Sequence, residues 1–159
     1  MGAKGETFAK QFEAKAQEVT STIECISDTD WKKVTTSEQW PVGVVAHHIA
    51  GSHQGLSGVV KMLADGKGGP SIDMEVIHAG NAKHAKDFAG VSKADTLALH
   101  KTNVAAVGTL LRGISDADYD KSGTVLKGMP SMSAGQLAGG LLCGHMDEHL
   151  KSIKATIGH

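Results

Sequence analysis

The sequence of 159 residues has few aromatic side chains, only two cysteines and no excess of charge of either sign. Aromatic residues make up 4% of it, and the formal net charge is −1. Because there is no basic run or domain-wide basic excess, nucleic acid is not expected as the main partner. The two thiols, Cys25 and Cys143, lie far apart in the sequence, which favours buried thiols over a disulfide or a zinc knuckle.

Long apolar runs are also missing. No stretch approaches the ~20 residues needed to cross a bilayer, and no charged-then-apolar leader opens the chain. The chain begins with Met1-Gly2, but position 6, where a myristoylation signal needs Ser or Thr, is Glu6. We therefore expect no membrane association and a cytoplasmic location. The length suits a single domain, residues 1–159, with a sizeable core.

Hydrophobic periodicity predicts four amphipathic helices. They span roughly 6–26, 37 or 40 to 65, 92–114 and 133–157. Pro41 suits the first turn of the second helix, and Ser92 with Asp95 three positions later forms a weakened capping box at the third. Glycines at 139, 140 and 144 weaken the fourth helix, each by ~1 kcal/mol relative to Ala. Glycine kept inside a helix suggests close approach by another backbone or a ligand.

The segments between these helices are read as connections. Residues 31–39 are polar and predict a loop, and Gly66–Pro70 is the strongest helix breaker in the chain. Residues 72–88 are weakly helical, which predicts one or two short helices in a long connection. No sustained period-two alternation is present, so strands are not expected. The pattern predicts an all-α four-helix bundle, and the long stretch between helices two and three allows a crossover.

Two histidines on the fourth helix are the first candidates for metal ligands. His145 and His149, in the motif HMDEH, are four positions apart and therefore lie one above the other on a helix face. Both fall on the flank of the inner face, away from Lys151 and Lys154. Two buried neutral imidazoles each need hydrogen-bond partners, and one shared metal ion satisfies both.

A third ligand is expected from the double histidine of the second helix. At ~100° per residue, His48 lies about 60° from the centre of the apolar face, whereas His47 falls almost opposite that centre. We therefore predict that His48 faces the core and that His47 is solvated. His53, about 80° from the centre on the other flank, is a lesser candidate.

The remaining histidines and one glutamate are weaker candidates for a role at a metal site. His100 lies in the apolar seam of the third helix and is read as a packed core residue, or as a pocket wall near the metal. His78 and His84 are read as surface residues, and His159 is set aside. HMDEH also fits the H-x-x-E-H motif of inverted zinc peptidases, with Glu148 as base. Those enzymes need a further acidic ligand well downstream, and only ten residues follow His149, so a solvated Glu148 is favoured.

These segments together resemble the DinB-like superfamily over nearly the whole chain. Residues 37–54 (SEQWPVGVVAHHIAGSHQ) resemble its helix that carries one ligand, which falls on His48. Residues 92–120 are similar to its third helix, and residues 131–153 to its last helix with the closing HxxxH at His145 and His149. Only the three-histidine set is specific, and Pro41 and Gly43 depart from the usual motif.

The resemblance implies an up-down-down-up bundle, often a homodimer, in which His48, His145 and His149 hold a divalent metal such as Zn or Ni. Some relatives use the metal to activate a low-molecular-weight thiol for S-transfer or isomerisation. Hydrolysis fits the same ligand set, with Glu148 or His100 moving protons. Two alternatives stay open at this point: a non-catalytic bundle that binds a metal or a small ligand, and a bundle without metal. The sequence assigns no role to His53, His78, His84 or Asn81.

Overall fold

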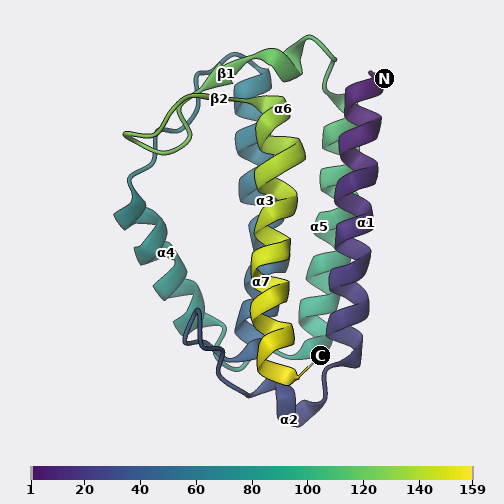
Figure 1. The fold of residues 1–159 in the computed structure, drawn as a ribbon, viewed down its shortest axis with the longest axis vertical. Coiled ribbons are helices and arrows are strands. Elements are labelled where there is room, and N and C mark those ends of the chain that lie inside the picture. Colours follow the sequence, from purple (N-terminus) through teal and green to yellow (C-terminus); the bar gives the residue numbers. More distant parts are fainter. Residues whose placement is uncertain (1, 159) are drawn as a thin grey trace.

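The protein is a bundle of four long helices with a fifth helix outside it, as a computed structural model that describes residues 2–158 shows (Figure 1). The bundle helices are α1 (Ala3–Cys25), α3 (Val42–Ala64), α5 (Lys93–Gly113) and α7 (Leu142–Ile157). The fifth helix is α4 (Met74–Asp87). The predicted all-α four-helix bundle is confirmed. Met1 and His159 lie outside the described residues.

Shorter elements complete the chain. They are α2 (Asp28–Trp31), the 3-10 turn Asp118–Asp120, β1 (Ser122–Gly123), β2 (Met132–Ser133), α6 (Ala134–Gln136) and the π-helical turn Leu137–Leu141. The strands pair antiparallel, so the expectation that strands are absent is wrong in this detail. Two residues are too few for an alternation of polar and apolar side chains to show in the sequence.

Side chains cap α5, as the sequence indicates, and also the start of α6. Oγ of Ser92 accepts a hydrogen bond from the Asp95 N–H at 3.0 Å and begins α5. Ser133 and Gln136 form a reciprocal capping box, which satisfies two backbone N–H groups that a helix start leaves without partners. The fourth predicted helix therefore begins at Ala134 and continues through the π-helical turn into α7.

Contacts between helices set their directions. Arg112, near the end of α5, forms ion pairs with Glu6 and Glu13 in the first half of α1. Lys93, at the start of α5, donates to the carbonyl of Ile26, just after α1. α1 and α5 are therefore antiparallel. Figure 1 shows α7 running in the same direction as α1, and α3 running alongside α5. The chain returns from the end of α3 to the start of α5 through α4.

Helix α4 lies apart from the bundle along most of its length (Figure 1). None of its residues is buried. Only its C-terminal part reaches the bundle, where His84 and Phe88 contact His47. The expected weakly helical connection is thus a single 14-residue helix, which covers one flank of α3.

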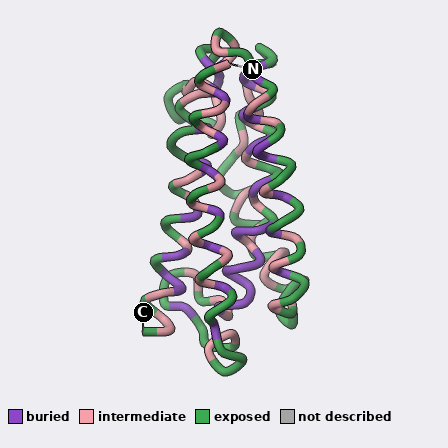
Figure 2. The backbone as a smooth tube through the Cα atoms, turned by 90° about the vertical axis from the view of Figure 1, so that its right-hand side faces the viewer, coloured by how far each residue is buried: buried purple, intermediate pink, exposed green. Residues whose placement is uncertain are grey.

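The core lies between the inward faces of the four bundle helices, which alternate with exposed outer faces in Figure 2. Among the largest fully buried side chains are Phe12, Ile23, Ile49, Leu63, Leu111, Tyr119, Leu137, Leu142, Met146 and Ile153. Both tryptophans pack against this core, and the Trp31 indole N–H donates to the carbonyl of Val91 at 3.0 Å. No helix within residues 2–158 combines the length and hydrophobicity that a bilayer span requires.

The helix glycines only partly match the expectation of close contacts. A Cβ added at Gly139 would lie 2.8 Å from Cε1 of Phe8, so this glycine makes room for the ring on α1. A Cβ at Gly140 or Gly144 would meet nothing within 4 Å. Close approach therefore explains one of the three glycines, and the neighbour is a side chain rather than a backbone.

Candidate metal centre

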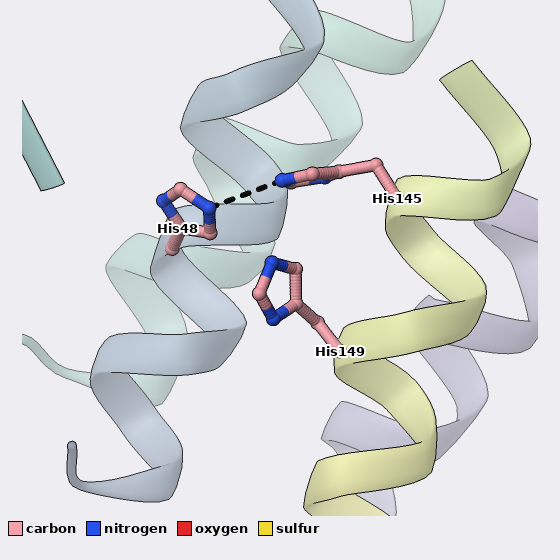
Figure 3. Close-up of side chains that lie close together, drawn as sticks. All are labelled: His48, His145 and His149. Atoms are coloured by element: carbon pink, nitrogen blue, oxygen red, sulfur yellow. Dashed lines mark hydrogen bonds between the residues drawn. The ribbon is translucent and has the colours of Figure 1, made fainter. Parts of the chain in front are cut away.

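Three histidine rings from two helices converge between α3 and α7 (Figure 3). His48 comes from α3, and His145 and His149 come from adjacent turns of α7. One nitrogen of each ring lies within 4.8 Å of the others, and Nε2 of His48 lies 3.1 Å from Nε2 of His145. The structure thus brings together the three histidines singled out in the sequence, while all three stay partly buried.

This donor set fits a divalent ion. Two imidazole nitrogens bound to one tetrahedral zinc at 2.0–2.1 Å lie about 3.3 Å apart, close to the 3.1 Å between His48 and His145. Nδ1 of His145 is buried without a partner among the described residues, and Nε2 of the same ring faces Nε2 of His48. An ion held by these three rings would keep an open position for water or substrate.

Burial keeps two of these imidazoles, His48 and His145, neutral. Burial lowers the pKa of His48 to about 3, and the neighbouring rings of His145, His149 and His84 add to the decrease. Burial and, to a smaller extent, His149 lower the pKa of His145 to about 4. At neutral pH both rings therefore carry free lone pairs, which metal binding requires.

A carboxylate orients the third ring. Nδ1 of His149 donates to Oε1 of Glu38 at 2.8 Å, and the Ser152 hydroxyl donates to Oε2 of Glu38 at 2.6 Å. Burial alone would raise the pKa of Glu38, but hydrogen bonds from Ser152, Thr35 and His149 outweigh it and hold the pKa low. An ionised Glu38 fixes His149 as the Nδ1–H tautomer, so that Nε2 is free for a metal.

Glu38 was not among the residues expected from the sequence. It lies in a tight turn before α3, in which the Thr35 N–H donates to the carbonyl of Trp40 at 2.8 Å and Gln39 has a left-handed φ of 59°. The turn presents the carboxylate to α7. Because a loop has no periodicity, the only signal in the sequence was an acidic residue in the loop that precedes the histidine helix.

Two expectations about histidines were wrong. His47 is 6% exposed rather than solvated, because α4 covers it. Its ring stacks on Phe88 with centroids 4.0 Å apart, and its Nδ1 lies 2.8 Å from Nε2 of His84. His84, read as a surface residue, is therefore partly buried, and its ring centroid lies 5.5 Å from that of His48. Trp40 packs its edge against His48 on this side, with centroids 5.5 Å apart.

His53 and His100 form a second, separate pair in the core. They are 0% and 1% exposed, and Nε2 of His53 lies 3.1 Å from Nδ1 of His100. His100 is thus a packed core residue. Glu148 is exposed, as is His78, whereas Asn81 is partly buried.

A four-helix bundle in which three imidazoles from two helices meet at one point defines a class of helical proteins with a potential metal centre. Comparison of the sequence with known families matches residues 11–153 to the DinB superfamily. The chain therefore belongs to the DinB superfamily. A comparison with functionally curated proteins finds no match.

Two solved structures share the fold. YfiT from Bacillus subtilis, described as a probable metal-dependent hydrolase with an unusual four-helix bundle topology, aligns with a TM-score of 0.75 and 16% identity, over 97% of this chain and 87% of its own. The mycothiol-dependent maleylpyruvate isomerase aligns with a TM-score of 0.74 and 12% identity, over 94% of this chain. The chain spans 60% of the length of that isomerase. At these identities the likeness shows the fold alone.

Proposed function

We propose that the protein is a metal-dependent enzyme whose ion is held by His48, His145 and His149. The observation that carries this proposal is the convergence of three imidazoles from two helices, each with one nitrogen within 4.8 Å of the others. A divalent ion held by three neutral ligands keeps its positive charge, and it lowers the pKa of a water or a thiol bound at its open position. Zn and Ni are the ions we expect, although Cu and Fe also suit imidazole ligands.

Neighbouring side chains orient the proposed ligands and enclose the site. Glu38 orients His149, and Trp40 packs beside His48 and limits the space around its ring. His84 and Phe88, at the end of α4, close the flank next to His47. These groups leave a partly buried site, in which electrostatic interactions are stronger than in bulk water. For Glu148 and His100, a role in proton transfer stays a prediction.

Two reactions fit the proposed ligand set. Hydrolysis uses an activated water, and the likeness to YfiT supports it. Transfer or isomerisation that depends on a low-molecular-weight thiol uses an activated thiol, and the likeness to the mycothiol-dependent isomerase supports that. The alternative is a non-catalytic bundle that binds a metal or a small ligand. From the family resemblance we also expect a homodimer.

Metal content measured on purified full-length protein tests the proposal. We expect close to one equivalent of Zn or Ni after equilibration with either ion. His48→Ala, His145→Ala and His149→Ala should each lose it, whereas the exposed control His78→Ala should retain it. His47→Ala should also retain it, and loss of metal in that variant alone would mean that His47, rather than His48, is the ligand on α3.

Turnover then separates an enzyme from a binding protein. Metal-loaded protein would be assayed with ester and amide substrates and, separately, with thiol cofactors and electrophilic acceptors. Activity that disappears with the metal in one of the two assays identifies the reaction class. A loaded protein that is inactive in both assays favours the non-catalytic alternative.

A further inference from the structure

Helix α4 lies against the flank of the candidate metal centre without packing into the bundle (Figure 1). None of its residues is buried. Its half-buried residues include Ile77, Asn81 and His84, which recur about once per turn and so mark the side that faces the bundle. Because the hydrophobic contribution scales with the area removed from water, a helix that buries so little gains little free energy from its position. A few specific contacts therefore hold α4 in place.

The contacts at the C-terminal end of α4 meet on one histidine of α3. Nε2 of His84 lies 2.8 Å from Nδ1 of His47, and the two rings are stacked with centroids 5.0 Å apart. The ring of Phe88 also stacks on His47, with centroids 4.0 Å apart. Among residues 2–158, no other side-chain hydrogen bond or ion pair joins α4 to a bundle helix. We call His47, His84 and Phe88 the latch.

The N-terminal end of α4 is joined to a loop instead of to the bundle. The Ile72 N–H donates to the carbonyl of Val125 at 3.0 Å, and Asp73 forms an exposed ion pair with Lys127 at 3.3 Å. Beyond the latch, Gly90 has open space around its Cα, since an added Cβ would meet nothing within 4 Å. Loss of the latch contacts alone would therefore free the C-terminal end of α4 from the bundle.

The latch lies directly beside a candidate ligand. His47 precedes His48 in α3, and the ring of His84 contacts that of His48 with centroids 5.5 Å apart. Trp40 adds to this cover, with its centroid 6.2 Å from that of His84. On the α7 side, the side chain of His149 is only 13% exposed. While the latch is closed, a substrate therefore has little access to an ion held by these rings.

We propose that α4 is the lid of the metal centre and that it opens at the latch. Separation of His84 and Phe88 from His47 uncovers the side of His48 that faces α4, and a water or substrate molecule enters there. Closure then restores the partly buried environment, in which electrostatic interactions are stronger than in bulk water. The inference rests on the proposed function for what enters the site, whereas the opening of α4 can be measured without metal.

Hydrogen exchange of the metal-free protein tests the opening. The amides of α4 should exchange about tenfold or more faster than those of α3, because α4 opens without unfolding of the bundle. His84→Ala and Phe88→Ala should each speed exchange in α4 roughly 2–10-fold, the factor that one net hydrogen bond or one aromatic pair represents. The matched control is His78→Ala, at an exposed position of α4. Equal protection of α4 and α3 in the wild type overturns the inference, even if no latch variant folds.

Chemical modification of the histidines measures access to the site. Diethyl pyrocarbonate acylates neutral imidazoles, and mass spectrometry identifies the modified residue. In the metal-free protein, His84→Ala and Phe88→Ala should each raise the rate at His48 roughly 2–10-fold, whereas His78→Ala should not. His53 is 0% exposed in the core, so it should stay unreactive unless a substitution disturbs the bundle itself. An equal rate at His48 in all four proteins overturns the lid.

Zinc kinetics separate a lid from a residue that supports the ligands. A lid that closes equally well with and without metal changes the rates of entry and exit by the same factor and leaves the affinity unchanged. His84→Ala should therefore take up zinc, and release it to a chelator, roughly 2–10-fold faster, at an affinity within about twofold of the wild type. A 10–100-fold loss of affinity without faster uptake would show that His84 orients His48, and would overturn the lid.

The two proposals can fail separately. A wild type that binds none of the metals tried overturns the proposed function, while hydrogen exchange and modification still decide whether α4 opens. A wild type that binds zinc, with exchange of α4, reactivity of His48 and release of zinc all unchanged in both latch variants, overturns the lid and leaves the metal site standing.

Discussion

Glu38 and His149 are 111 positions apart in the chain, yet Nδ1 of His149 donates to Oε1 of Glu38 at 2.8 Å. The carboxylate stands in a turn before α3, while the imidazole stands on α7. Ser152, one turn after His149, holds the second oxygen of the same carboxylate. One loop residue therefore ties the two helices that carry the candidate ligands and sets the orientation of one of them.

Removal of this carboxylate should weaken metal binding. For Glu38→Ala we expect a 10–100-fold loss of zinc affinity, because His149 loses the acceptor that fixes its tautomer. Glu38→Gln keeps an acceptor oxygen but loses the charge, so its loss should be smaller. Titration with a competing zinc chelator measures both. Glu75→Gln, at an exposed position on α4, is the matched control, and equal affinities in all four proteins would contradict the role of Glu38.

Acid should destabilise the metal-free protein well before most carboxylates titrate. The folded pKa values of His48 and His53 are about 3 and that of His145 is about 4, below the ordinary value of 6.5. Below pH 6.5 the unfolded chain binds protons that the native state does not. The free energy of unfolding should therefore be highest above pH 6.5 and fall towards acid, by up to ~1.4 kcal/mol per pH unit for each histidine.

Urea denaturation of the metal-free protein at pH 7.5, 6.0 and 5.0 measures this dependence. His53→Leu removes one of the titrating groups and should give a shallower slope. A free energy of unfolding that stays constant between pH 7.5 and 5.0 would mean that these histidines are not buried as neutral groups.

Metal removal should lower the melting temperature. An ion that binds only the native state at 100 times its dissociation constant adds about 2.7 kcal/mol to the free energy of unfolding. For a domain of this size that corresponds to roughly 5–10 °C. Calorimetry with zinc and with a chelator measures the difference. His145→Ala should melt at the same temperature in both conditions, and a chelator effect that persists in this variant would place the ion elsewhere.

Two glycine substitutions should change stability in opposite directions. Gly144 is exposed in α7, and an added Cβ meets nothing within 4 Å, so Gly144→Ala should stabilise by up to ~1 kcal/mol. At Gly5 an added Cβ would lie 2.6 Å from the backbone carbonyl of Leu111, so Gly5→Ala should destabilise by ~1–3 kcal/mol. Thermal melts of both variants check the sign, and destabilisation by Gly144→Ala would show that the helix needs glycine there.

Periodicity was informative wherever one face of a helix meets the core. It predicted the long helices and the inward orientation of His48, because a regular helix places side chains at fixed angles. It failed for His47, since α3 is buried on nearly all sides near its start and α4 covers the flank that was expected to be solvated. The angle of a side chain from the centre of one apolar face does not predict its burial when the helix has neighbours on two sides.

The contacts made around the candidate ligands could not be predicted from sequence patterns. Glu38 lies in a loop, and His53 pairs with a histidine on another helix, so neither contact leaves a local spacing in the sequence. His84 approaches the site because α4 returns along the bundle. These contacts follow from tertiary packing over long separations in the sequence.

The π-helical turn Leu137–Leu141 has a consequence for how this chain can vary. Leu137 and Leu142 are both fully buried although they are five residues apart, a separation that turns a regular helix by about 140°. The wide turn thus absorbs one surplus residue and lets the capped start and the histidine-bearing end of the helix face the interior together. A relative whose last helix is regular throughout would need one residue fewer between its capping serine and its first histidine to keep both ends of the helix facing the core.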